Sequence, residues 1–153
     1  FHHQHATLAA LADAFPALTI VHDHMGTAVP QADDEAAQRR AFVEWRDGMR
    51  ELARRPNVMC KIGGLGLPFW GFGFNQRTDP VGYLELAELF GPQRCLMEGN
   101  FPVDGRSAGF VPLWNALKHL TRDCAPADRL AMFHDNAARV YRLDLPARPA
   151  TAR

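Results

Sequence analysis

The sequence lacks the features that mark several large classes of protein. Its 153 residues hold only three cysteines, Cys60, Cys95 and Cys124, an odd number without a C-x-x-C spacing. This favours reduced thiols in a cytoplasmic protein over a disulfide scaffold or a zinc knuckle. No run of about 18 apolar residues occurs and no signal peptide is recognisable, so we expect no membrane partner.

An excess of charge of either sign is also absent. Lysine plus arginine and aspartate plus glutamate number 17 each, which gives no electrostatic reason to expect a nucleic-acid partner. The glycine-rich residues 63–66 lack the lysine of a P-loop, and no G-x-S-x-G serine elbow occurs. Hydrophobic residues make up 47% of the chain and charged residues 22%, which is typical of a globular domain with a core.

What the sequence does contain is an alternation of short apolar runs and amphipathic stretches. Period-two and β-branched runs predict three strands, at residues 18–24, 57–62 and 94–98. Apolar side chains at helical spacing predict six helices, at residues 7–15, 34–55, 80–90, 109–123, 126–133 and 136–143. Strands that alternate with helices predict an α/β fold with parallel strands. A loop rich in glycine and aromatic residues, 63–74, has the length of a lid or binding loop.

Each predicted strand ends in polar side chains. His22 and His24 end the first strand, Lys61 the second, and Glu98 and Asn100 follow the third. Because side chains two apart share a face, we expect His22 to lie beside His24 and Glu98 beside Asn100. The carboxyl ends of parallel strands meet at one edge, so these residues predict one wet site there. Taken singly, a strand-end histidine is more often a hydrogen-bonded core residue, and Lys61 can extend to solvent.

Aromatic side chains follow the polar ones on two loops. Phe101 and Pro102 turn the chain over the expected site, and Trp70 lies in the loop that follows the second strand. The aromatic residues of that loop either line an apolar pocket or plug one end of the core. Both readings stay open on the sequence alone.

Taken together, four segments resemble the last part of the amidohydrolase-related family. They are IVHDHMG at residues 20–26, NVMCKIGGLG at 57–66, FGPQRCLMEGNFPVD at 90–104 and NAARVYRL at 136–143. Members are TIM-barrel hydrolases that include sugar lactonases and pyrone-dicarboxylate lactonases, with decarboxylases as cousins. The resemblance implies that residues 1–143 form strands six to eight of a partial (β/α)8 barrel with their helices. A full barrel takes about 250 residues, so we expect a longer protein, with residues 144–153 as a loose tail.

The resemblance also implies roles for individual residues. His24 falls on the family's sixth-strand histidine, which is a metal ligand or a substrate contact. Asn100 falls where many relatives carry an aspartate that orients or deprotonates the attacking water. A carboxamide cannot accept a proton near neutral pH, so Asn100 is expected to position water or a carbonyl group, while Glu98 or Asp104 supplies the carboxylate. The family's H-x-H metal motif sits on the first strand of the barrel, one of the strands expected to be absent here, and nothing in this sequence matches it in that position.

These implications lead to an enzyme that hydrolyses a small cyclic ester or a related carbonyl substrate. His24, Glu98 and Asn100 are the expected catalytic residues. The attacking water is activated either by a divalent metal, zinc or manganese, bound at His24, or by polar side chains alone. The expected substrate contacts are Lys61, His22, Trp70 and Phe101. Two alternatives stay open: a decarboxylase of the same superfamily, and a catalytically silent α/β fragment. Such a chain is either an incomplete barrel or a structural module that self-associates as a homo-oligomer, since three parallel strands leave two open edges that invite pairing with a second copy.

Overall fold

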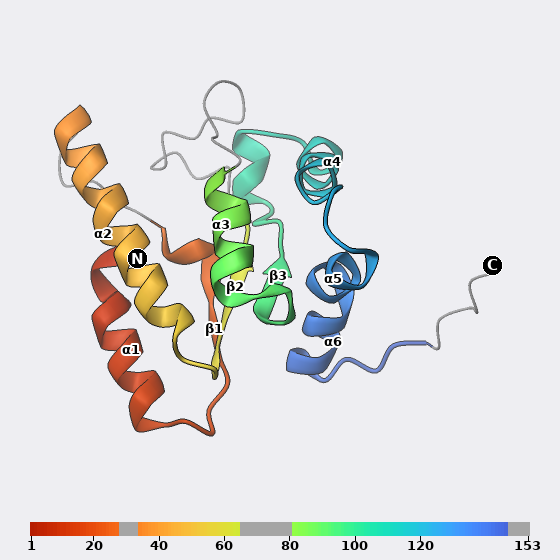
Figure 1. Cartoon of the computed structure of the whole chain (residues 1–153). Coiled ribbons are helices and arrows are strands. Elements are labelled where there is room, and N and C mark those ends of the chain that lie inside the picture. Colours follow the sequence, from red (N-terminus) through yellow and green to blue (C-terminus); the bar gives the residue numbers. More distant parts are fainter. Residues whose placement is uncertain (28–33, 65–80, 147–153) are drawn as a thin grey trace.

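Three short parallel strands run through the middle of the molecule (Figure 1). The computed structural model describes residues 1–27, 34–64 and 81–146. The strands β1 (Ile20–His22), β2 (Val58–Ile62) and β3 (Cys95–Met97) lie in the order β1-β2-β3. Both neighbouring pairs are parallel, which confirms the predicted α/β fold with a parallel sheet, although β1 and β3 are shorter than expected.

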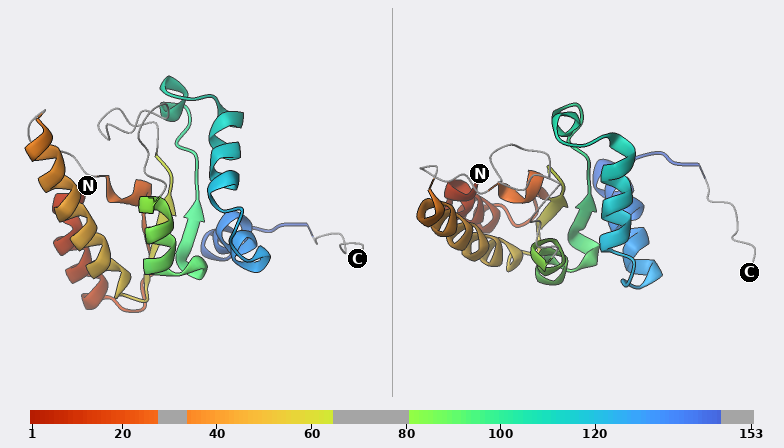
Figure 2. Two further views of the ribbon diagram at one scale, coloured as in Figure 1. Left: turned by 45° about the horizontal axis from the view of Figure 1, so that its top comes forward. Right: turned by 90° about the horizontal axis from the view of Figure 1, so that it is seen from above.

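Helices connect the strands and lie on either side of them. Figures 1 and 2 show α1 and α2 side by side on one side of the sheet and α4, α5 and α6 on the other, beyond β3. Four helices match their predicted ranges closely: α1 (His5–Ala14), α2 (Glu35–Ala53), α3 (Val81–Phe90) and α4 (Phe110–Leu120). A short 3-10 turn at His2–Gln4 precedes α1, and others lie between the helices at Asp23–Gly26, Pro92–Arg94 and Val103–Arg106. None of the helices in the described ranges is long and apolar enough to cross a membrane.

The prediction of two separate C-terminal helices is wrong, because helical turns continue from Pro126 to Tyr141 without a break. They comprise α5 (Pro126–Leu130), a π-helical segment (Ala131–Asp135) and α6 (Asn136–Tyr141). The wider π turn carries the helix past the polar residues where we expected it to stop. It also brings buried Asn136 against β3, where its Nδ2 donates to the carbonyls of Pro92 and Cys95, each at 2.7 Å.

The core lies between the sheet and its helices. On the strands, its side chains belong mainly to one face, as alternate positions 58, 60 and 62 of β2 show. On the long helix α2, Trp45, Met49 and Leu52 are buried, as their helical spacing predicted. Asp34 caps the start of this helix, and its carboxylate accepts a hydrogen bond from the Ala37 main-chain N at 2.7 Å.

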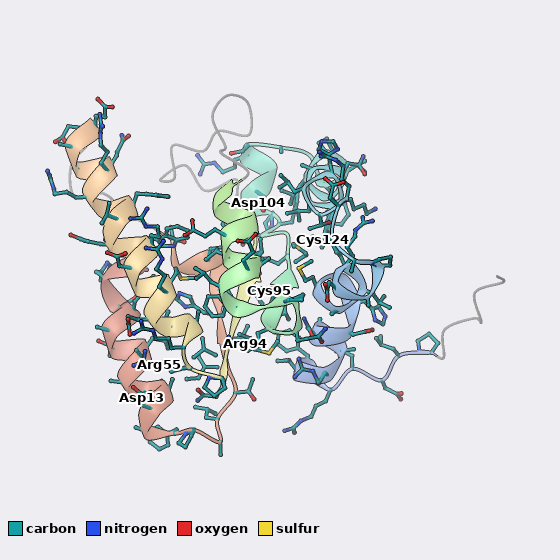
Figure 3. All side chains as sticks on the ribbon, in the orientation of Figure 1. Asp13, Arg55, Arg94, Cys95, Asp104 and Cys124 are labelled. Atoms are coloured by element: carbon teal, nitrogen blue, oxygen red, sulfur yellow. The ribbon has the colours of Figure 1, made fainter. Side chains whose placement is uncertain are left out.

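Arg94 ties the amino-terminal end of the sheet together. One guanidinium nitrogen donates to the carbonyls of Arg55 and Val58, at 2.8 and 3.2 Å, and the other donates to the carbonyl of Ala53 at 2.8 Å. In Figure 3, Arg94 lies toward the lower end of the molecule, as Arg55 does, while Asp104 lies toward the upper end. Arg94 thereby joins the end of α2 to the starts of β2 and β3.

Asn57 makes a second tie at the same end. Its Nδ2 lies 3.1 Å from each of three carbonyl oxygens, those of Ala12, Phe15 and Leu18. These carbonyls belong to the end of α1 and to the loop that leads into β1. The side chain therefore fixes the connection between the first helix and the first strand.

Candidate active site

The carboxyl ends of the three strands bring His24, Lys61 and Glu98 together. Glu98 continues the ladder beyond β3, since its main-chain N donates to the Ile62 carbonyl at 3.1 Å. Glu98 Oε1 lies 2.5 Å from His24 Nδ1 and accepts from the His24 main-chain N at 3.1 Å. Glu98 Oε2 lies 3.4 Å from Lys61 Nζ. The polar strand ends thus meet at one edge, as the sequence predicted for these three residues.

Glycine at position 63 makes the approach of Glu98 to β2 possible. A Cβ atom added to Gly63 would lie 2.1 Å from Glu98 Cγ and 2.6 Å from the Glu98 carbonyl oxygen. Any side chain there would push Glu98 away from the ends of β1 and β2. The first glycine of the run after β2 is therefore a packing requirement of the cluster.

Two carboxylates flank the Lys61 ammonium group. Its Nζ lies 3.0 Å from Asp23 Oδ1, in addition to the 3.4 Å contact with Glu98, and 5.7 Å from the centre of the Tyr141 ring. Partial burial by itself lowers the pKa of Lys61, but the hydrogen bond to Asp23 and the charge of Glu98 outweigh burial and raise the pKa above its usual value. Lys61 is therefore charged and already paired within the protein.

Glu98 also sets the state of His24. The hydrogen bond to the Glu98 carboxylate raises the pKa of His24, against the smaller effect of partial burial. Because a carboxylate accepts and does not donate, Nδ1 carries the proton and Nε2 is the nitrogen left for a ligand or a substrate. The side chain of His24 is 30% exposed, against 13% for Glu98, so the imidazole is the accessible partner.

The expected shared face of His22 and His24 is wrong. Strand β1 ends at His22, and Asp23–Gly26 forms a tight turn in which alternation of faces no longer applies. His22 is buried and its Nε2 lies 3.1 Å from Nε2 of His5, away from the His24–Glu98 pair. Burial lowers the pKa of both rings, to about 4 for His22 and about 3 for His5. These two histidines are neutral core residues, the more common alternative for a strand-end histidine.

The segment after Glu98 folds back on itself through Asp104. This residue is fully buried, and its carboxylate accepts from the Asn100 main-chain N at 2.8 Å, while its own N donates to the Asn100 carbonyl at 2.7 Å. Asp104 thus shapes the loop, and Glu98 is the carboxylate that joins the His24–Lys61 cluster. Phe101 packs against Phe110, with ring centres 5.3 Å apart. Trp70 and the other aromatic residues of its loop lie outside the described residues.

The described residues do not by themselves make a metal centre. Among them there is no group of three or more histidine, cysteine, aspartate or glutamate side chains placed to hold an ion. His24 Nε2 offers one nitrogen with a carboxylate behind the other, an arrangement typical of metal-bound histidine. This part of the chain can therefore supply one ligand and its supporting carboxylate, but not a closed coordination sphere.

The sequence did not predict the contacts that Asp23 and Tyr141 make with Lys61. Asp23 follows His22 directly, and only the turn after β1 brings its carboxylate to Lys61. Tyr141 had no sequence signal at all, because its contact with Lys61 depends on how far the C-terminal helix continues. The position of the acidic Asp23 beside the strand-end histidines was the one feature of the sequence that could have indicated its place near the site.

Comparison with known proteins extends these observations. A family model described as amidohydrolase matches residues 1–143. Protein y4mH of Sinorhizobium fredii is 39% identical over 134 residues, covering 87% of this chain and 42% of that protein. An L-fucono-1,5-lactonase of Burkholderia multivorans is 30% identical over 135 residues, covering 84% of this chain and 44% of the lactonase.

Solved structures agree with the sequence comparison. The crystal structure of an amidohydrolase from Burkholderia multivorans with bound zinc superimposes with a TM-score of 0.74 at 26% identity, covering 94% of this chain and 50% of the other. Amidohydrolase 2 from Bifidobacterium longum shares the fold, with a TM-score of 0.64 at 23% identity, over 92% of this chain and 47% of the other. The chain thus spans about half the length of the proteins it matches.

Proposed function

This chain belongs to the amidohydrolase family, and on that premise we propose that the full-length protein hydrolyses a small cyclic ester, with a sugar lactone as the first candidate. The observation that carries the proposal is the His24–Glu98 pair at the carboxyl ends of the strands, held at 2.5 Å beside Lys61. Two relatives named L-fucono-1,5-lactonase, 30% and 32% identical, support a lactone as the substrate class.

In this proposal His24 is the group that meets the reacting carbonyl. Attack of water on a lactone develops negative charge on the carbonyl oxygen, and a nearby donor stabilises that charge. Glu98 holds the Nδ1 proton and raises the pKa of His24, so that Nε2–H can donate to the oxygen. When a divalent metal such as zinc or manganese is bound in the full-length protein, neutral Nε2 is instead the ligand that this part of the chain supplies. Because a relative was crystallised with bound zinc, the metal-dependent form of the mechanism should be tested directly.

The other polar residues have supporting roles in the proposal. Asn100 positions the water or the carbonyl, since a carboxamide cannot be the base. Lys61, with Asp23 at 3.0 Å and Glu98 at 3.4 Å, has its charge already balanced, which favours an uncharged substrate over a carboxylate-bearing one. Phe101, together with Trp70 from the loop after β2, provides apolar contacts to the substrate.

The test is an assay of the full-length protein with L-fucono-1,5-lactone and a panel of other aldonolactones, with metal content measured on the same sample. His24→Ala and Glu98→Gln should each lower kcat/KM by about a hundredfold or more, because both remove stabilisation of the developing charge. His119→Ala and Glu51→Gln change exposed residues of the same types and serve as controls. Unchanged turnover in both site variants would remove the assignment.

A decarboxylase of the same superfamily is a second candidate that the sequence does not separate from a hydrolase, and release of carbon dioxide from a β-keto or aromatic acid would identify it. For the chain on its own, the open edges of a three-stranded sheet favour a second reading, self-association without catalysis. Size-exclusion chromatography of the chain alone tests it, since a defined dimer would support a homo-oligomer. We further propose a cytoplasmic location, supported by three cysteines that are all free thiols.

A further inference from the structure

The turn that carries His24 has an unusual backbone. Three consecutive residues have positive φ: His24 at 52°, Met25 at 53° and Gly26 at 66°. Glycine adopts this region freely, but residues with a Cβ atom rarely do, and here two of them follow one another. Such a backbone persists only where surrounding contacts hold it, and it is concentrated at functional sites.

The space around Gly26 explains why the turn cannot be relieved at its last residue. A Cβ atom at that position would lie 2.2 Å from Nε2 of His22 and 2.3 Å from Nε2 of His5. The buried histidine pair therefore packs directly against the turn. This contact limits Gly26, but it does not by itself select the left-handed conformation of His24 and Met25.

Hydrogen bonds from Thr27 to the His24 carbonyl close the turn locally, and Trp45 adds a constraint from α2. Its side chain is buried, and its indole N–H donates to the carbonyl oxygen of Met25 at 2.5 Å. The Met25 side chain is only 2% exposed and belongs to the same core cluster as Trp45. The middle residue of the turn is thus fixed twice, through its side chain and through its carbonyl.

Fixing Met25 has a direct consequence for His24. Both the main-chain N and Nδ1 of His24 reach one oxygen of Glu98, and residue 24 makes these two contacts in the left-handed conformation. If the Met25 carbonyl were released, the peptide between residues 25 and 26 could rotate and the two bonds to Glu98 would no longer be held together. A carbonyl left unpaired in the core would also favour rearrangement of the turn.

We propose that Trp45 is a positioning residue of the candidate site: its indole N–H holds the Met25 carbonyl and thereby the turn that presents His24 to Glu98. The structural part stands on the contacts above, and its catalytic consequence rests on the proposed lactone hydrolysis. Trp45 itself touches neither substrate nor reacting atoms in this proposal.

The test compares two tryptophan-to-phenylalanine changes in the full-length protein. Trp45→Phe removes the indole N–H that bonds to Met25. Trp114→Phe is the matched control, because Nε1 of Trp114 is also buried but has no hydrogen-bond partner among the described residues. We expect Trp45→Phe to lower kcat about tenfold with little change in KM, and Trp114→Phe to leave both unchanged.

A second readout does not depend on turnover. The backbone amide of His24 donates to Glu98, so its NMR resonance should move in Trp45→Phe in the direction seen in Glu98→Gln, and stay in place in Trp114→Phe. A His24 amide that is unchanged in folded Trp45→Phe would overturn the proposal, as would an equal effect of Trp114→Phe. A moved amide with unchanged kcat would overturn its catalytic part.

The two proposals can fail separately. If the protein hydrolyses no lactone, the His24 amide still decides whether Trp45 positions the turn. If Trp45→Phe does not fold, the unmodified protein provides the answer, because the bond predicts a scalar coupling between the indole nitrogen of Trp45 and the Met25 carbonyl carbon. Absence of that coupling would show that the constraint does not exist.

Discussion

The two ends of the same three strands use polar side chains in opposite ways. At the amino end, Arg94 and Asn57 donate to main-chain carbonyls of α1, α2 and the neighbouring loops. At the carboxyl end, His24, Lys61 and Glu98 bind one another and remain partly exposed. In Figure 3, Arg94 lies toward the lower end of the molecule, and Asp104, from the loop that follows Glu98, lies toward the upper end.

The difference teaches how to tell a structural polar residue from a functional one. A carbonyl does not titrate, so a side chain committed to carbonyls holds the chain in one arrangement. An imidazole paired with a carboxylate can exchange a proton and still present its second nitrogen. Parallel α/β folds place stability at the amino ends of the strands and chemistry at their carboxyl ends. Mutations at the two ends should therefore act on different measurements.

The largest effect on stability should come from Arg94→Met. The change keeps much of the aliphatic length but leaves the carbonyls of residues 53, 55 and 58 without their charged donor. A fully buried acceptor left unsatisfied costs about 1–3 kcal/mol, but these contacts are only partly buried and the Arg55 carbonyl keeps the Val58 main-chain N as a donor, so we expect a total loss of about 3 kcal/mol in the free energy of unfolding. Denaturant unfolding measures it, and Arg122→Met, at an exposed arginine, is the control. A loss of unfolding free energy similar to that of the control would contradict the stabilising role of Arg94.

A smaller loss is expected for Asn57→Ala. One amide group is removed from three carbonyls at 3.1 Å, two of which belong to exposed stretches where water can replace it. We expect a loss of about 2 kcal/mol in unfolding free energy, with kcat/KM of the folded enzyme unchanged. Asn115→Ala on the exposed surface of α4 is the matched control. A selective loss of turnover at full stability would break the division between the two ends.

The buried pair His5 and His22 predicts a dependence of stability on pH. Burial lowers the pKa of His5 to about 3, so the folded protein keeps this ring neutral while the unfolded chain takes up a proton below about pH 6.5. The stability it contributes is therefore present at higher pH and lost as the pH falls below about 6.5.

His5→Gln should reduce that dependence. Between about pH 7 and pH 5.5, the wild-type protein should lose about 1 kcal/mol more unfolding free energy than the variant, since one depressed histidine has been removed. His119→Gln, which changes an exposed histidine, is the matched control. Identical slopes in wild type and His5→Gln would show that this ring titrates normally in the folded protein.

The smallest effect on stability is expected for Glu98→Gln, the same change that should abolish most turnover. Lys61 keeps Asp23 as a partner at 3.0 Å, and the carboxamide can still accept from His24. Because Glu98 is only 13% exposed, its pairing is worth more than a surface salt bridge, and we expect a loss of about 1 kcal/mol in unfolding free energy. A loss comparable to that of Arg94→Met would place Glu98 among the structural residues and erase the contrast between the two ends.

Much of the architecture was predictable, because it follows from local patterns. Alternating and helical spacings of apolar residues predicted the three parallel strands and four of the helices within a few residues. The convergence of His24, Lys61 and Glu98 followed from their places at strand ends. The break expected near residue 134 did not occur, since tertiary contacts of Asn136 with β3 favour a π turn over a helix end.

The sequence by itself determined the order of elements, their parallel arrangement and the edge where polar groups gather, because these depend on periodicity and on the handedness of the chain. Only the tertiary structure decided that His22 turns inward while His24 faces Glu98, 74 residues away. It also decided that Lys61 is shared by two carboxylates and that Trp45 holds the left-handed turn. Those outcomes depend on contacts between distant segments, and a conformation unfavourable for isolated residues exists only where such contacts stabilise it.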